Sequence, residues 1–375
     1  MINRRIIRGK VLQQLFAYKT CCAANLEITQ EAVIQHFSSV LNPDFSGEDS
    51  KKLDGYGKMT LVGLEEYVRT NKVDQDNGPE EINSALRTFT NQYNTYNQND
   101  RRLILKKMIS DTEKIFDYYL MTLQILIEAA HKISSIRKND RLWNNPILQK
   151  LDNSALLKNE ISRHHISWNN DQDIVNEVVT YILDSKEFIT YSATVNLSFE
   201  EERKMLLHIA KNLVLKNPNL NDHFEIIDLN WDEDKVAVKD MVDDTIKAVS
   251  ETEDFTLATI SKNWEDDKEF MKALFENTLD NENEYEDYIS PQLKNWDISR
   301  LTGTDNILMK MCVSEMINFS NIPVKVSINE YIELSKRYST PKSKMLINGV
   351  LDNLSQKLIK DKIIRKSGRG LMDNK

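Results

Sequence analysis

Glycine, proline and cysteine are scarce in this sequence, and each shortage argues against a class of protein. The 375 residues include only 10 Gly and 7 Pro. Turn-rich sandwiches and barrels need glycine, as do the phosphate loops of nucleotide-binding folds, so these folds are disfavoured. The cysteines, Cys21, Cys22 and Cys312, form neither an even-numbered framework nor a metal-type spacing. A disulfide scaffold and a zinc module are therefore not expected.

Long apolar runs are also missing. The longest, around residues 118–127, contains Gln124 and ends at Glu128, well short of the roughly 18 residues that a membrane span needs. The beginning of the sequence is too basic for a signal peptide and lacks its apolar centre. We therefore predict a cytoplasmic protein that makes no contact with a membrane.

Motifs of catalysis and cofactor binding are absent as well. The sequence contains no G-x-G-x-x-G, P-loop, H-E-x-x-H, G-x-S-x-G or C-x-x-C pattern. The neighbouring His164 and His165 would point about 100° apart on a helix, which does not suit two ligands of one metal. We predict that the protein is not an enzyme and that it holds no cofactor and no metal.

What the sequence does have is an uneven distribution of charge. The net charge is −9, yet residues 1–20 contain five Lys/Arg and no acid, and residues 336–375 contain eleven Lys/Arg against three Asp. The stretch between these two ends is therefore strongly acidic. Such asymmetry points to a polyanionic partner for the ends, with plain solvation of basic termini as the alternative.

The apolar residues recur almost everywhere with a helical period. Residues 1–19 are predicted to be a helix that buries Ile7, Val11 and Leu15, with Arg5, Arg8 and Lys19 within about 60° of one another on a different face. A second short helix is predicted at residues 29–40. The polar, low-complexity stretch 91–99 (NQYNTYNQN) is predicted to be a loop or linker.

Helix-start signals are clear near the end of the chain. Ser327 and Glu330 have the spacing of a capping box, which predicts a helix running to Tyr338. Thr340 and Pro341 then look like the N-cap and first residue of the last long helix. A basic tail follows this helix and is predicted to be frayed.

Two segments of this helical sequence resemble the NusB family of transcription antitermination factors. The first comprises Arg4-Arg-Ile-Ile-Arg8 and Gln13-Gln-Leu-Phe16. The second runs from Asp267 to Leu358 and carries the more specific pattern, which consists of Pro323, Asn329-Glu330, Glu333-Leu334, Ser343, Asn348-Gly349 and Asp352. The stretch between them looks like the acidic helical insertion of long NusB-like proteins from Bacteroidetes.

The resemblance implies an all-α fold, a NusB-like helical bundle with an additional inserted helical region. We expect residues 1–40 to form the arginine-rich part of the bundle and residues 261–360 its C-terminal part. Residues 41–260 would be the acidic insertion, with a linker near residues 91–99, and residues 361–375 the basic tail.

The function that the resemblance implies is transcription antitermination. NusB-like proteins pair with NusE, a small-subunit ribosomal protein that also acts in transcription. Together they bind the single-stranded boxA element of nascent RNA, mostly in ribosomal RNA leaders. The complex then joins other Nus factors on RNA polymerase and suppresses premature termination.

The matching positions place RNA contacts near the two ends of the chain: Arg4, Arg5, Arg8, Gln13, Phe16, Tyr338, Lys342, Ser343, Lys344 and Leu346. Arginine suits this role because its planar fork donates two hydrogen bonds to phosphate and stacks on bases. Three positions depart from the family pattern. Phe16 stands for a usual Tyr, Lys342 for a common acid and Leu346 for a common Phe. Asp305 matches an acidic residue that the family uses toward NusE.

Other interpretations stay open at this point. Some ribosomal RNA methyltransferases carry a NusB-like domain, although they also need a glycine-rich α/β cofactor domain, which is not found here. The protein could also be a helical scaffold that binds basic proteins and no RNA. Asp305 could be only a charge that stabilises a helix N-terminus, and Tyr338 only a packing residue.

Overall fold

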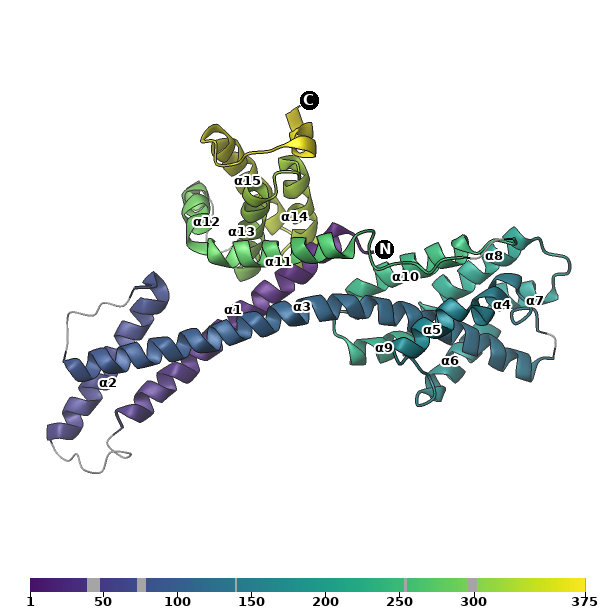
Figure 1. The fold of residues 1–375 in the computed structure, drawn as a ribbon, viewed down its shortest axis with the longest axis horizontal. Helices are drawn as coiled ribbons and strands as arrows, with labels where there is room; N and C mark the ends of the chain where they lie inside the picture. The colour runs from purple at the N-terminus through teal and green to yellow at the C-terminus, as the bar shows by residue number, and fades with distance from the viewer. Residues whose placement is uncertain (39–47, 73–78, 139, 253–254, 296–301, 375) are drawn as a thin grey trace. The chain divides into compact units, whose positions relative to one another are not determined.

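The computed structural model is built from helices alone in the part of the chain that it describes (Figure 1). It describes residues 1–375 except for 39–47, 73–78, 139, 253–254, 296–301 and 375. Fifteen α-helices, α1 to α15, and a few short π- and 3-10-helical segments lie in these residues, and no strand does. The predicted all-α fold is confirmed. None of the described helices is long and apolar enough to cross a membrane.

The chain folds into two compact units. Unit 1 contains residues 1–8 and 109–271, and unit 2 contains residues 9–108 and 272–375. Two long helices, α1 (Arg4–His36) and α3 (Glu80–Ile136), contribute residues to both units. The predicted buried stripe of α1 is confirmed, since Ile7, Val11 and Leu15 are at most 1% exposed.

Unit 1 is a cluster of short helices packed around aromatic side chains. Its complete helices are α4 (Pro146–Asn153), α5 (Ala155–Arg163), α6 (Gln172–Leu183), α7 (Lys186–Ala193), α8 (Phe199–His208), α9 (Pro218–Ile227) and α10 (Trp231–Ala248), with a π-helical turn at Ile209–Val214. Trp168, Phe224 and Trp231 are at most 1% exposed at its centre. Asn, Ser and Pro residues at the helix starts explain the many short elements, because they satisfy or remove orphan backbone N–H groups.

Unit 2 combines two helical groups. Most of α1 lies with α2 (Glu48–Thr70) and the first part of α3, and the other group contains α12 (Glu282–Ile289), α13 (Gly303–Asn318), α14 (Val324–Tyr338) and α15 (Ser343–Lys360). Helix α11 (Trp264–Asp280) contributes residues to both units. Helix α13 is the centre of its group, because residues 307–316 are all buried and α12, α14 and α15 pack on it. A helix that is buried on every side belongs to the core of its group.

The polar stretch 91–99 was predicted as a loop, and this is wrong. It lies inside α3, where Tyr93 is 8% exposed. The Nδ2 atom of Asn25 donates to Asn97 Oδ1 at 3.0 Å, and Asn94 Nδ2 donates to the Tyr67 hydroxyl at 2.6 Å. These contacts from α1 and α2 outweigh the weak helix propensity of Asn. The separate helix predicted at 29–40 is also wrong, since α1 continues to His36 and residues 39–40 lie outside the described part.

Both predicted helix starts near the C-terminus are wrong. Helix α14 begins at Val324, one residue after Pro323, so Ser327 does not cap it. The Ser327 hydroxyl instead donates to Glu315 Oε1 at 2.7 Å. Helix α15 begins at Ser343, and the Thr340 hydroxyl forms a hydrogen bond with the Ser343 hydroxyl, while the Thr340 carbonyl accepts from the Ser343 N–H at 3.0 Å. Lys366 Nζ donates to the Phe319 carbonyl at 2.9 Å, so the tail is not simply frayed.

A buried polar cluster in unit 1 generates a stability prediction. Arg141 donates to Glu202 Oε1 from Nη2 at 2.7 Å, Asn145 Nδ2 donates to Oε2 at 2.9 Å, and the Tyr191 hydroxyl donates to Oε2 as well. Glu202→Ala would remove the carboxylate that accepts from all three donors and leave the partly buried Arg141 charge without its ionic partner, so we expect a loss of about 3–5 kcal/mol. Thermal and urea unfolding followed by circular dichroism measures it.

Glu200→Ala, on the same helix, is the matched control. The Glu200 side chain is 64% exposed and pairs with Arg203, so its loss should cost under about 1 kcal/mol. Equal unfolding free energies for the two variants would contradict a structural role for the Glu202 cluster.

Candidate nucleic-acid interface

The turn between α14 and α15 is held by one buried carboxylate, that of Asp305. This side chain has 0% exposure and lies in the first turn of α13. It accepts hydrogen bonds from the Thr302 backbone N–H at 3.1 Å, from the Ser343 hydroxyl at 3.0 Å and from the Ser339 hydroxyl. The Thr302 hydroxyl in turn accepts from the Asp305 backbone N–H at 3.1 Å, which completes a capping box. The carboxylate thus joins the start of α13 to the α14–α15 turn.

The same turn presents several predicted site residues to solvent. Lys342 and Lys344 are exposed, and Tyr338 is half-buried at the end of α14. Gln13 of α1 donates from Nε2 to the Tyr338 hydroxyl at 3.5 Å. Phe16 is 52% exposed, and three residues after Gln13 it lies on the same side of α1. Unit 2 therefore carries an amide, two aromatic rings and two lysines among the residues predicted to bind RNA.

Next to Phe16 is a groove of about 440 Å³ in unit 2, lined by residues of α1, α12 and α13. Lys310, with 9% of its side chain exposed, donates to Glu282 at 2.9 Å and lies 2.8 Å from Glu286. Lys19 also pairs with Glu282. The groove is therefore lined by compensated charges rather than by a free basic patch.

The ion pairs shift the pKa values of three side chains in and beside the groove, those of Glu282, Glu286 and Lys310. Burial by itself would raise the pKa of Glu282, but Lys19 and Lys310 outweigh it and hold that pKa below its ordinary value. The pKa of Glu286 is lowered in the same way, against burial, by Lys310 and Asn306. Burial would lower the pKa of Lys310, and its two carboxylate partners raise it instead. The cluster is therefore charged near neutral pH.

The three predicted arginines lie in unit 1, at the start of α1, and differ from one another. Arg5 is exposed. Arg4 donates to Asp266 at 2.7 Å, lies 3.6 Å from Asp267 and has 39% of its side chain exposed. Arg8 is 3% exposed, with its guanidinium 5.5 Å from the centre of the Phe270 ring. Arg8 is therefore buried against this ring, and its predicted contact with RNA stays a prediction.

Three other predicted contacts are buried too. Asp305, Ser343 and Leu346 are 0%, 3% and 7% exposed. The prediction that Asp305 contacts a partner protein does not fit this burial, because its carboxylate is already bonded within the turn. Ser343 is a donor to the same carboxylate, and Leu346 is a core residue of α15. Ser339 and Thr302, which the sequence analysis missed, complete the cluster. The hydroxyl-rich run Ser339-Thr340 was the available signal.

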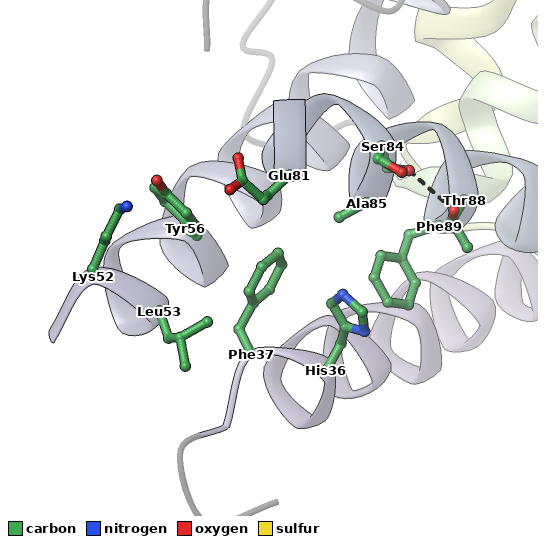
Figure 2. Close-up of a pocket in the computed structure, with 10 residues that line it drawn as sticks. All are labelled: His36, Phe37, Lys52, Leu53, Tyr56, Glu81, Ser84, Ala85, Thr88 and Phe89. Carbon is green, nitrogen blue, oxygen red and sulfur yellow. Dashed lines mark hydrogen bonds between the residues drawn. The ribbon is translucent and has the colours of Figure 1, made fainter. Parts of the chain in front are cut away.

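A second hollow lies elsewhere in unit 2, among α1, α2 and α3 (Figure 2). It encloses about 420 Å³, and four of its ten lining residues have aromatic rings: His36, Phe37, Tyr56 and Phe89. The His36 ring lies 4.7 Å from that of Phe37 and 5.6 Å from that of Phe89, centre to centre, both edge-on. None of these residues was predicted as a site residue, so the hollow is separate from the predicted interface.

The features on unit 2 are those of a helical protein with a basic, aromatic-bearing surface, which is chemistry suited to single-stranded nucleic acid. Comparison with known proteins shows what the C-terminal part of the chain is similar to. Residues 230–356 match the model of the NusB family. The matched residues include the α14–α15 turn and Asp305 but not Arg4–Phe16, and they begin before the expected Asp267.

Three curated relatives, each named transcription antitermination protein NusB, give the same result. Those of Chloroherpeton thalassium, Salinibacter ruber and Clostridium kluyveri are 42%, 40% and 47% identical over 86, 84 and 78 residues. These alignments cover 23%, 22% and 21% of this chain and 41%, 52% and 47% of the relatives. The chain thus spans about half the length of the relatives it matches. No solved structure matches it.

Removal of the Asp305 carboxylate tests the turn. Asp305→Ala leaves the Ser339 and Ser343 hydroxyls and the Thr302 N–H without their acceptor, so we expect a loss of about 2–4 kcal/mol in urea unfolding. Lys342→Ala, at an exposed position of the same turn, should stay within about 0.5 kcal/mol of the parent. If Asp305→Ala unfolded like the parent protein, the carboxylate would not hold the turn.

The ion pair between Glu282 and Lys310 predicts how the free energy of unfolding depends on pH. An acid whose pKa is lowered in the folded state stabilises the protein above its unfolded pKa, and this stabilisation is lost as the pH falls through the folded pKa. We therefore expect the unfolding free energy to fall as the pH drops from about 5 to about 3, and to fall less steeply in Lys310→Met. Urea titrations at each pH measure the slope.

Lys344→Met is the control for this series, since it removes an exposed lysine of the same unit. Its pH slope should equal that of the parent protein. A Lys310→Met slope indistinguishable from both would mean that the buried lysine does not set the pKa of its acidic partners.

Proposed function

We propose that this protein is a transcription antitermination factor, which binds boxA-type single-stranded RNA of ribosomal RNA leaders together with NusE. In this proposal it acts without catalysis in the cytoplasm, and the complex joins other Nus factors on RNA polymerase. The NusB domain at residues 230–356 and the names of the three relatives support the proposal. The methyltransferase alternative has no comparable support, because the relatives reported above are named as antitermination proteins.

The observation that carries the proposal is the contact between Gln13 and Tyr338 in unit 2. It brings a helix near the start of the chain to the basic turn near its end, across 325 positions of sequence. An amide of this kind reads base edges, and exposed aromatic rings stack on unpaired bases. Phe16 and Tyr338 are the proposed stacking residues, and Gln13 is the proposed base reader.

Cations supply the remaining part of the proposed site. Lys342 and Lys344 are exposed on the turn and would contact phosphates. Arg5, and Arg4 after exchange of its carboxylate partners for phosphate, would add contacts from the start of α1 in unit 1. Because they are buried, Ser343 and Leu346 are proposed to position the turn within unit 2, and Arg8 to position the start of α1 within unit 1.

The decisive experiment compares RNA affinities. A boxA-type RNA and a scrambled RNA of equal length are titrated with the protein, with and without NusE, in fluorescence anisotropy. We expect tighter binding of the boxA-type RNA in the presence of NusE. Log affinity should fall with log salt by about 0.7 per phosphate contacted. The double change Lys342→Ala/Lys344→Ala should flatten that slope by about 1.4, and Arg5→Ala by about half as much.

Lys58→Ala, on α2 of the same unit, is the matched control and should leave both affinity and slope unchanged. Phe16→Leu should weaken binding by about 1–3 kcal/mol, because stacking is lost while an apolar side chain remains. Equal affinity for the two RNAs in every mixture would contradict the proposed function. An unchanged salt slope in the lysine variant would remove the turn from the interface.

A further inference from the structure

The end of α9 and the turn that follows it in unit 1 expose three large aliphatic side chains. Ile226, Ile227 and Leu229 are 85%, 50% and 95% exposed, and together we call them the aliphatic knob. Single exposed aliphatic residues are ordinary, but a cluster of them commonly marks a binding surface. Turns favour Gly, Asn, Asp and Ser, so Leu229 at a turn has no local reason for its position.

The backbone of this turn is fixed by hydrogen bonds on both sides of Leu229. The Asp228 N–H donates to the Phe224 carbonyl at 2.8 Å, and the Trp231 N–H donates to the Asp228 carbonyl at 3.0 Å. The Asp228 carboxylate accepts from the Asn230 N–H at 2.9 Å and from the Tyr118 hydroxyl at 3.1 Å. Leu229 is therefore held outward by its two neighbours.

Beneath the turn lies a packed aromatic cluster. The Phe224 and Trp231 rings are 4.2 Å apart, centre to centre, and the Tyr118 ring lies 5.6 Å from Phe224 and 5.7 Å from Trp231. The Trp231 indole N–H donates to Asn221 Oδ1 at 2.9 Å. Because this base is rigid, a partner that covers the knob has little protein ordering to overcome.

The charges around the knob indicate what kind of partner fits. Residues 218–249 contain nine Asp/Glu and three Lys. Asp222, Glu225 and Asp232, on the two helices that flank the knob, are exposed. A negative field of this kind repels RNA and anionic membranes and attracts a basic surface.

We propose that the aliphatic knob is a docking site for a basic protein, whose apolar groove takes Leu229 and Ile226 while Lys and Arg residues at the groove's edge meet the acids of α9 and α10. This site is separate from the proposed RNA interface and does not depend on it. Rigid apolar anchors of this type commonly dominate the affinity of an interface.

A synthetic amphipathic helical peptide, with Leu on one face and Lys/Arg on the other, is the probe. It is titrated into the full chain by calorimetry at low salt. We expect saturable binding that is at least about tenfold weaker in Leu229→Ser/Ile226→Ser. The single change Leu229→Met should bind the peptide with the affinity of the parent protein, since it keeps an apolar side chain at this position. Because both substituted residues are exposed, thermal unfolding of these variants should match that of the parent protein.

Three controls decide whether the knob and its charges act as proposed. Val195→Ser removes another aliphatic side chain of unit 1, which is 76% exposed, and should bind the peptide like the parent. A peptide with Glu in place of Lys/Arg, and one with Gln in place of Leu, should each bind at least about tenfold more weakly. Absence of peptide binding, or equal binding by the knob variant, would overturn the proposal.

Two further outcomes would assign the knob to a different occupant. Knob-dependent binding to phosphatidylcholine vesicles would identify a lipid surface instead of a protein. Knob-dependent dimerisation in sedimentation velocity would identify a second copy of this chain. Either result overturns the proposal. The proposal is supported if the protein is monomeric, does not bind the vesicles and binds the basic peptide. Loss of RNA binding in the variants of the α14–α15 turn has no bearing on these measurements.

Discussion

The charge of one buried carboxylate determines how the α14–α15 turn can present its lysines. Asp305 comes from α13, the helix that the rest of its group surrounds, and its partners come from the turn after α14, the start of α15 and the segment before α13. A buried charge is tolerated only when hydrogen bonds replace its hydration. The requirement for three donors fixes the positions of Ser339 and Ser343, and the exposed Lys342 and Lys344 follow from those positions.

Three buried ionisable side chains of α13 each have hydrogen-bonding or ionic partners, and Asp305 is the first of them. Lys310 lies between Glu282 and Glu286, and Glu315 accepts from the Ser327 and Tyr331 hydroxyls. Each buried charge thus has named partners on a different neighbouring helix. Partners of this kind are more specific than apolar contacts, because a slipped helix would leave a charge without its donors. The packing register of α12 and α14 on α13 is explained by these pairs.

Local signals predicted the helical character of the chain and the buried stripe of α1, but not the helix bounds that long-range contacts determine. The stripe of Ile7, Val11 and Leu15 was visible because a helix repeats every 3.6 residues. The helical state of residues 91–99 was not visible, because it depends on Asn25 and Tyr67, which lie on other helices. Ser327 matched the capping pattern, yet α14 begins at Val324 and the Ser327 hydroxyl donates a hydrogen bond to Glu315. Short patterns carry no information about such distant partners.

The candidate site shows the same division. The charge distribution showed that basic residues gather near the two ends of the chain, and the resemblance to the NusB family indicated which of them would contact RNA. Neither showed whether these side chains are exposed or buried. Arg8 is covered by Phe270, and Asp305 by the hydroxyls of the turn. Lys342 and Lys344 remained exposed because the turn places them outside the packed faces of α14 and α15. Burial depends on which helix packs where, and this is decided by the whole core.

The bounds of the matched segment do not coincide with a piece that could be expressed alone. A fragment ending at residue 356 would stop inside α15 and discard Leu358, which is 1% exposed, while a start at residue 230 would strip α10 of its neighbours α8 and α9. Such a fragment would also lack Lys19, the partner of Glu282 on α12. Recombinant work on the NusB portion therefore needs α1, α8, α9 and the complete last helix, supplied in one polypeptide or by co-expression.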